Sequence, residues 1–187
     1  MRRAAGVAAL LLYVIHATEL IRRGEPYDLL WGCHLAALLV GVGLLLERPR
    51  PNAVGVLWSC FGLPLWIIYL FSGDDVMLSS AFTHLGALAL GVYGVRQLGM
   101  PRGSAGAALA AYFALWMLTR VATPAWANVN LAFRVYPGWE RWFHSYPIYF
   151  ATLFALAAVV FLVFECFFRR FVSQVSPADS AAMTVRA

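Results

Sequence analysis

The chain has 187 residues, of which 62% are hydrophobic and 12% are charged, and its mean hydropathy is +0.73. A soluble domain of this length needs more polar surface, so the composition predicts an integral membrane protein. The net charge of +5 rests on arginine because the chain contains no lysine, which excludes chemistry through a lysine Schiff base. The arginines flank apolar segments, as topology determinants do, so nucleic acid is not an expected partner.

Six apolar segments follow one another along the chain. A helix needs about 20 apolar residues to cross the hydrocarbon core of a bilayer, with a range of roughly 17–25. All six segments fall in this range, and most are separated by short turns rich in Gly and Pro. We therefore predict an all-α, polytopic membrane bundle over residues 1–171. In chain order the predicted spans are Ala4–Ile21, Leu29–Leu46, Ala53–Phe71, Val76–Leu98, Ala105–Val121 and Ile148–Phe168.

The two ends of the chain call for separate interpretations. Met1, Arg2 and Arg3 before an apolar core also fit a cleaved signal peptide. The sequence Ile15-His16-Ala17 lacks the small residue that cleavage needs at position −3, so a retained helix is favoured. Residues 172–187 are rich in Ser and Ala and are predicted to form a disordered cytoplasmic tail.

Arginine placement predicts the orientation. If six spans alternate in direction, nine arginines fall on the side of the two termini and five on the opposite side. Because positive residues concentrate in the cytoplasm, both termini are expected there, with the chain in a bacterial plasma membrane. Asp74-Asp75 and the long connection from Ala122 to Pro147 then lie outside.

Ionisable residues inside the predicted spans are the first functional candidates, because they are costly in a membrane. His16 and Glu19 stand three residues apart and share a helix face, which suits either a histidine oriented by a carboxylate or an interfacial ion pair. His84, beside Thr83 and after Ser79 and Ser80, is the strongest candidate because it lies deepest. The whole set falls near the predicted outer ends of four spans: His16, Glu19, Cys33, His34, His84 and Arg120.

The connection between the last two spans is unusual in its composition. Seven of the 26 residues from Ala122 to Pro147 are aromatic, and Asn128, Asn130 and Arg134 lie among them. Irregular backbone at membrane depth requires protein or a water-filled cavity around it. This segment is predicted either to fold over the polar layer or to act as an aromatic anchor at the membrane interface.

Several short motifs occur in an order that resembles the bacterial YwaF-like conserved integral membrane proteins and, more distantly, the androgen-induced and androgen-dependent six-span hydrolases of animals. The matching stretches span roughly the second to the sixth predicted helix. They are Leu30-Trp31-Gly32-Cys33-His34-Leu35, Trp66-Ile67-Ile68-Tyr69, Thr83-His84-Leu85-Gly86, Asn128-Val129-Asn130 and Val135-Tyr136-Pro137. The order of Cys33 and His34 is inverted relative to the bacterial pattern, and the threonine of the animal hydrolases has no counterpart at its place.

The resemblance implies acyl-ester chemistry on membrane lipids without a cofactor. We expect an intramembrane lipid hydrolase or acyltransferase with His84 as base, because a nucleophile is weak until a base activates it. The remaining roles are assigned as sets: Cys33, His34 or Thr83 in catalysis, Asn128, Asn130, Arg120 and Arg134 in substrate binding, and His16 and Glu19 in orientation.

Two alternatives stay open at this stage. One is a metal or haem site built from His16, Glu19, His34 and His84, since three histidines and a carboxylate suit zinc or iron. The other is a scaffold or small transporter that performs no chemistry. The substrate, the nucleophile and the oligomeric state are not predicted by the sequence.

Overall fold

The computed structural model describes residues 1–71 and 77–173. Over these residues the fold is all-α, with six long or medium helices, two short 3₁₀ segments and a π-helical end. The elements are α1 (Arg2–Arg23), η1 (Pro26–Leu30), α2 (Gly32–Leu45), α3 (Pro49–Leu70), α4 (Leu78–Leu98), α5 (Ser104–Ala122), η2 (Val129–Leu131), α6 (Tyr146–Phe167) and η3 (Phe168–Val172). Asp74-Asp75 and the predicted tail from residue 174 onward lie outside the described residues.

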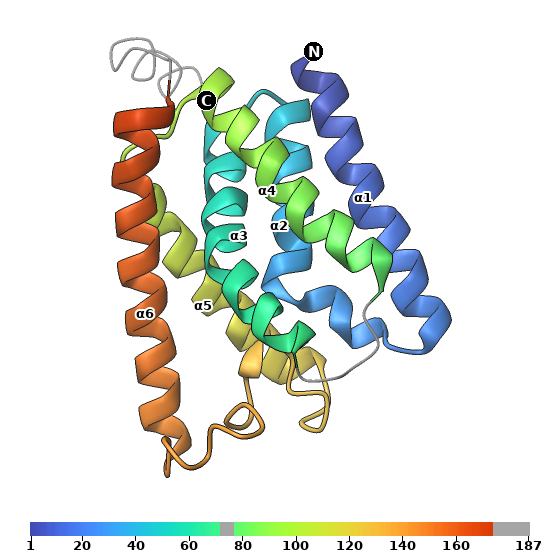
Figure 1. The fold of residues 1–187 in the computed structure, drawn as a ribbon, viewed down its shortest axis with the longest axis vertical. Coiled ribbons are helices and arrows are strands. Elements are labelled where there is room, and N and C mark those ends of the chain that lie inside the picture. The colour runs from blue at the N-terminus through green and yellow to red at the C-terminus, as the bar shows by residue number, and fades with distance from the viewer. Residues whose placement is uncertain (72–76, 174–187) are drawn as a thin grey trace.

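Five helices are long and apolar enough to cross a membrane, namely α1, α3, α4, α5 and α6 continued by η3. This is the architecture of a multi-pass membrane protein. Successive helices run in opposite directions, and the first residues of α1 lie at the same end of the bundle as the last residues of α6 (Figure 1). The bounds of these five helices differ by at most four residues from the predicted spans.

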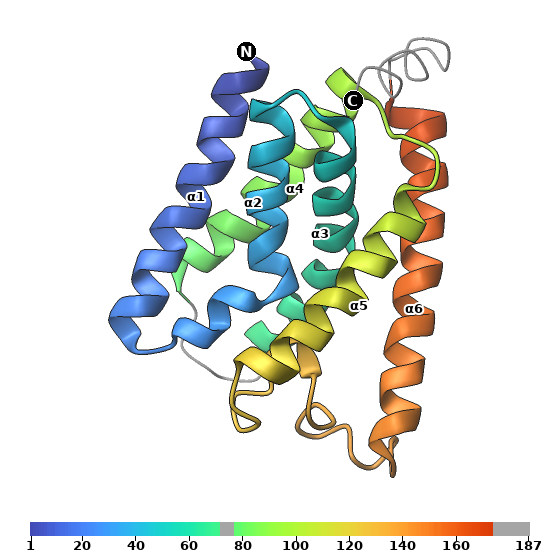
Figure 2. The same cartoon turned by 180° about the vertical axis from the view of Figure 1, so that it is seen from behind.

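The second predicted span, Leu29–Leu46, is shorter than expected. The α-helix begins only at Gly32, because Pro26–Leu30 form a 3₁₀ turn and Trp31 is extended with ψ 133°. Its 14 residues extend about 21 Å, less than the roughly 30 Å hydrocarbon core. None of them is exposed, because α2 packs against α1, α3 and α4 at the centre of the bundle (Figures 1 and 2).

Small residues allow the helices around α2 to approach closely. A Cβ at Gly6 would lie 2.6 Å from the backbone nitrogen of Leu45, so α1 and α2 are in direct backbone contact there. A Cβ at Gly94 would lie 2.3 Å from Oδ1 of Asn52, whose Nδ2 donates to the carbonyl of Gly91 at 3.0 Å. Such packing is what holds helices together where no hydrophobic effect acts between them.

Candidate functional site: a histidine and cysteine cluster at the head of an apolar cavity

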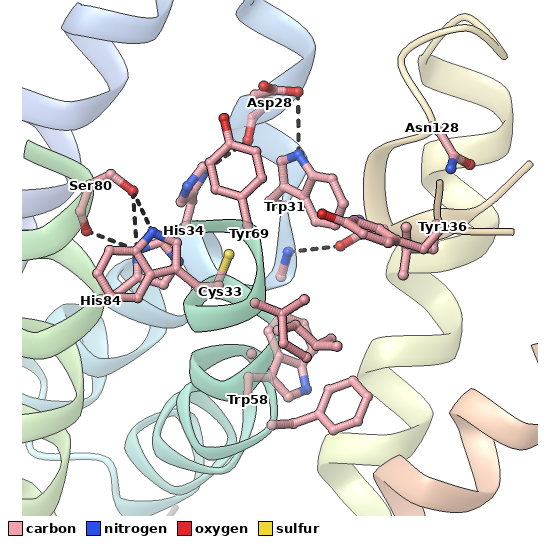
Figure 3. A pocket seen from close by; sticks show the side chains of 18 of the residues that line it. Asp28, Trp31, Cys33, His34, Trp58, Tyr69, Ser80, His84, Asn128 and Tyr136 are labelled. Atoms are coloured by element: carbon pink, nitrogen blue, oxygen red, sulfur yellow. Dashed lines mark hydrogen bonds between the residues drawn. The ribbon is translucent and has the colours of Figure 1, made fainter. Parts of the chain in front are cut away.

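A cavity of about 580 Å³ opens at the end of the bundle where α1 ends and α2 begins. Its walls come from α1, η1, α2, α3, α4, α5, the connection between α5 and α6, and the start of α6; Figure 3 shows part of this lining. Apolar and aromatic side chains such as Trp58, Phe61 and Leu65 form much of its surface. Three histidines and Cys33 line one side, so the cavity joins an apolar volume to a small polar group.

His84 has a ring nitrogen without a hydrogen-bond partner among the described residues, and the residue lines this cavity. The ring is buried on α4, with 5% of the residue exposed, and it stacks on Trp66 at 4.7 Å between centroids with 15° between planes. Its Nδ1 donates to the carbonyl of Ser80 at 2.8 Å, since a carbonyl can only accept. In the neutral ring Nε2 is therefore the acceptor, and this buried atom has no hydrogen-bond partner in the described part of the chain.

Cys33 and His34 occupy the first turn of α2. His34 donates through Nδ1 to the carbonyl of Asp28 at 2.7 Å, so a backbone group orients its ring as well. The Asp28 carboxylate accepts from the indole of Trp31 at 3.2 Å, and burial raises the pKa of this carboxyl although that hydrogen bond opposes the rise. Cys33 lines the cavity, and a Cβ at Gly62 of α3 would lie 3.1 Å from the Cβ of Cys33.

The start of α2 is held by a residue almost one hundred positions away. Oδ1 of Asn130 accepts from the backbone nitrogen of Gly32 at 2.8 Å, and its Nδ2 donates to the carbonyl of Leu30 at 2.7 Å and to Oγ1 of Thr119 at 3.0 Å. Asn130 itself has φ 53°, in the left-handed region that asparagine tolerates better than most residues. These hydrogen bonds fix the first turn of α2, which contains Cys33 and His34, relative to the connection between α5 and α6.

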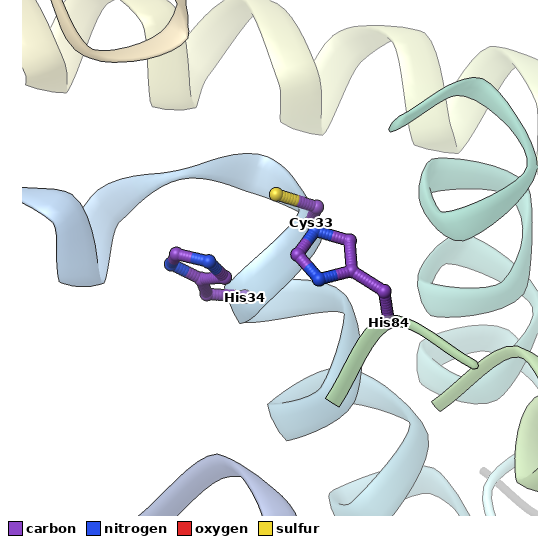
Figure 4. A group of neighbouring side chains, drawn as sticks. All are labelled: Cys33, His34 and His84. Atoms are coloured by element: carbon purple, nitrogen blue, oxygen red, sulfur yellow. The ribbon is translucent and has the colours of Figure 1, made fainter. Parts of the chain in front are cut away.

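Cys33, His34 and His84 come together from α2 and α4 (Figure 4). One candidate ligand atom from each lies within 4.8 Å of the other two. These donor types suit a zinc ion, so the trio is also the group best placed to hold a metal. Nε2 of His34, however, already lies 3.0 Å from Nε2 of His16, a distance at which the two rings share a hydrogen bond.

His16 and Glu19 meet through a residue of α4. Nδ1 of His16 lies 2.8 Å from the hydroxyl of Ser79, and that hydroxyl also bonds to the carboxylate of Glu19. The predicted shared face on α1 is therefore present, and Ser79 bridges the two side chains. His16 is buried, with 1% of the residue exposed.

Thr83 does not line the cavity. Its hydroxyl donates to the carbonyl of Leu12 on α1 at 3.2 Å, on the neighbouring face of α4 from Ser80 and His84. Thr83 thus serves the packing of α1 on α4.

The backbone of the long connection binds the side chains of Asn128, Arg134 and, from the end of α5, Arg120. Oδ1 of Asn128 accepts from the backbone nitrogens of Phe133 and Arg134, each at 3.0 Å. Arg134 donates to the carbonyl of Trp126 at 3.0 Å, and Arg120 donates to the carbonyl of Ala132 at 2.7 Å. Asn128, Asn130 and Arg134 still line the cavity, whereas Arg120 does not.

Three residues belong to the site although no catalytic or binding role was predicted for them from the sequence. Ser79 links His16 to Glu19, Trp66 covers one face of His84, and Tyr149 contributes a buried hydroxyl with no partner among the described residues. Tyr149 and His84 both line the cavity. Among the neighbours of His84 on α4, Ser80 could have been predicted from the sequence to contact it, because Ser80 stands one helical turn before His84.

Comparison of the chain with protein-family models, curated proteins and solved structures gave no match. The functional argument therefore rests on the geometry of this cavity.

Proposed function

We propose that the protein is an intramembrane ester hydrolase or acyltransferase in which Cys33 is the nucleophile and His84 the base. The observation that carries this proposal is the buried, unpartnered Nε2 of His84 at a cavity that also contains Cys33. A ring nitrogen of His84 lies within 4.8 Å of Sγ, a separation that substrate binding can close or one water can bridge. The Ser80 carbonyl supplies the third element of such a site, because it fixes the ring and its tautomer.

The form of the cavity supports a lipid ester as substrate. Its apolar walls suit an acyl chain, and its volume falls within the usual range for ligand pockets. We expect a side chain of the cavity wall to donate to the ester carbonyl, and Tyr149 is a candidate among the lining residues. Arg120 and Asn128 are less suited to this role than the sequence indicated, because backbone groups of the connection engage them.

We further propose that α2 counts as a sixth crossing and that both termini lie in the cytoplasm of a bacterium. The alternating helix directions and the arginine distribution support this arrangement. The cavity would then open toward the outer face. Reporter fusions test it: an alkaline phosphatase fused after residue 140 should be active, and one fused after residue 102 inactive. The reverse pattern would contradict the orientation.

Covalent labelling tests the chemistry directly. Membranes containing the protein are treated with a long-chain activated ester that carries an alkyne, and the acylated residue is identified by mass spectrometry. We expect acylation of Cys33, loss of labelling in Cys33→Ala, and a roughly 10²-fold slower reaction in His84→Ala. Cys60→Ala is the matched control, because Cys60 is buried on α3 and does not line the cavity. Equal labelling of all four proteins would refute the proposal.

A metal centre is the competing interpretation of the same side chains. It is favoured by the 4.8 Å grouping of Cys33, His34 and His84, and opposed by the use of the His34 lone pair in the bond to His16. Elemental analysis and an absorption spectrum of the purified protein distinguish the two. A stoichiometric metal or haem that disappears in Cys33→Ala and His84→Ala would replace the nucleophile assignment.

A further inference from the structure

Tyr112 of α5 is a residue of the cavity wall whose hydroxyl is not used by the fold. It is buried, with 7% of the residue exposed. Its ring packs against Trp58, Phe61 and Phe154, with centroids 6.2, 5.8 and 5.2 Å away. The hydroxyl makes no hydrogen bond within the described residues. Packing alone therefore holds this donor in place, and a buried polar group without a partner calls for a ligand.

Tyr112 also lies beside the proposed nucleophile. Its Cε2 would be 3.7 Å from a Cβ at Gly32, the residue before Cys33. Its hydroxyl is close enough to Cys33 for a charge on one group to act on the other. The helix that supplies His84, α4, and the helix that supplies Tyr112, α5, pack on opposite sides of α3 (Figures 1 and 2). Cys33 thus has a base on one side and a hydroxyl donor on the other.

The first turn of α2 supplies a second donor. The backbone N–H of Gly32 donates to Asn130, and that of His34 donates to the carbonyl of Trp31 at 3.0 Å. The N–H of Cys33 makes no backbone hydrogen bond within the described residues, and it faces the sulfur of its own side chain. Such N–H groups at a helix N-terminus favour negative charge. The buried, unpartnered Nε2 of His84 independently indicates that a molecule binds here.

We propose that the hydroxyl of Tyr112 and the backbone N–H of Cys33 form an oxyanion site for the carbonyl oxygen of the ester. The inference rests on the proposed function and narrows it, because it names Tyr112, instead of Tyr149, as the side chain that donates to the carbonyl. Fixed donors of this kind act on charge that appears only during the reaction. They therefore raise the rate more than the affinity for the ester.

The two donors act in the following steps. His84 removes the proton of the Cys33 thiol, and the sulfur forms a bond to the carbonyl carbon. The electron pair of the C=O bond moves to the oxygen, which accepts from Tyr112 and from the N–H of Cys33. The C=O bond then re-forms, the C–O bond to the alcohol breaks, and the alcohol leaves with the proton from His84. The same donors serve when water or an acceptor alcohol attacks the thioester.

The oxyanion site also determines how the ester lies in the cavity. Its carbonyl oxygen faces α5, and its leaving alcohol faces His84. On α3 the innermost residue of the cavity wall is Trp58, about 6 Å along the helix from Gly62, which lies beside Cys33. Tyr69 of the same wall lies about 10 Å from Gly62 in the other direction. The space beyond Cys33 is short, so a long acyl chain extends toward the open end of the cavity.

Tyr112→Phe tests the site in full-length protein in liposomes with a long-chain nitrophenyl ester. The variant keeps the ring but lacks the donor, so acylation of Cys33 and turnover should each fall roughly 10²-fold while KM changes little. The melting temperature should stay close to that of the wild type, because no hydrogen bond is lost. Tyr93→Phe is the matched control, since Tyr93 packs in a different cluster on α4 and does not line the cavity. It should keep wild-type turnover.

A long-chain aldehyde provides a second measurement. The thiol of Cys33 adds to it and forms a hemithioacetal, whose oxygen occupies the proposed oxyanion site without any leaving group. The aldehyde should bind Tyr112→Phe about tenfold more weakly than the wild type, and it should bind Tyr93→Phe as tightly as the wild type. The corresponding long-chain alcohol cannot form the adduct and should bind all three proteins alike.

The outcomes separate this inference from the proposed function. Wild-type acylation and aldehyde binding in Tyr112→Phe would overturn the oxyanion site and leave Cys33 as the nucleophile. A loss of turnover found in Tyr149→Phe and absent from Tyr112→Phe would do the same. Slower turnover of Tyr112→Phe with a lower melting temperature and unchanged aldehyde binding would also overturn it, because that loss is structural. If Cys33 of the wild type is never acylated, the proposed function fails and this inference fails with it.

Discussion

Two buried polar clusters, one around Glu165 and one around His84 at opposite ends of the bundle, differ in how their groups are partnered. At one end, the carboxylate of Glu165 accepts from the backbone nitrogens of Gly103 at 2.9 Å and Ala105 at 2.6 Å, and it lies 3.9 Å from Arg169. At the other end, the cavity wall leaves His84 Nε2 and the Tyr149 hydroxyl without partners among the described residues. A fully satisfied group stabilises the fold, whereas an unsatisfied one costs stability unless a ligand uses it. The contrast teaches which cluster is structural and which is available for chemistry.

The largest expected effect comes from His84, and it should fall on activity. His84→Ala should reduce ester turnover by about 10³-fold because it removes the base. Its effect on unfolding should be near 1 kcal/mol, since the hydrogen bonds that the ring makes within the described residues go to Ser80 on the same helix. Turnover and thermal denaturation in detergent measure the two quantities. His144→Ala, at an exposed position, is the control, and a comparable loss of turnover there would contradict the assignment.

Glu165 should show the converse behaviour. Glu165→Ala leaves two backbone N–H groups at the start of α5 without their acceptor and should lower the free energy of unfolding by about 3 kcal/mol. Glu165→Gln keeps an acceptor oxygen and should lose about half as much. Labelling of Cys33 in the fraction that remains folded should equal that of the wild type. A selective loss of labelling with unchanged stability would reverse the division between the two ends.

A smaller effect is expected where α3 and α4 cross. Gly94→Ala would place a methyl group 2.3 Å from Oδ1 of Asn52 and should destabilise the protein by about 2 kcal/mol. Gly106→Ala on α5 is the matched control, because no atom lies within 4 Å of its Cβ position. This second change should stabilise the helix by roughly 0.5–1 kcal/mol. Equal melting temperatures for the two variants would contradict the close packing of α3 on α4.

The smallest expected effect concerns Trp66. Trp66→Phe keeps an aromatic ring against His84 but removes the indole bond to the Ser80 hydroxyl, which is 3.1 Å long. A loss of about 1 kcal/mol in the positioning of His84 corresponds to roughly a fivefold decrease in turnover. Steady-state kinetics would detect this change. A decrease as large as that of His84→Ala would mean that Trp66 does more than hold the ring.

Hydropathy predicted most of the fold because lipid-facing helices must be apolar along their length. The sequence did not show that the α-helix of the second span begins only at Gly32 and is enclosed by its neighbours, because an apolar segment suits a crossing and an enclosed helix equally. The bond from Gly32 to Asn130 has no local signature in the sequence, because it joins residues 98 positions apart.

The residues of the candidate site could largely be predicted from the sequence, but their hydrogen bonds could not. Alternating spans placed His16, His34 and His84 at one end, and the structure brings their rings together. The sequence could not show that Thr83 faces α1, because that depends on the rotation of α4 in the bundle. Nor could it show which nitrogen of His84 is free, since this depends on a backbone carbonyl one turn away.

The enclosure of α2 has a consequence for biogenesis. A 14-residue helix that is covered on every side gains little from lipid, so it is stable only after its neighbours arrive. Membrane integration of the first half of the chain would then proceed by hairpins, with α2 retained beside the insertion machinery until α3 and α4 are synthesised. The cysteine and the histidine at its first turn would then reach their final surroundings late.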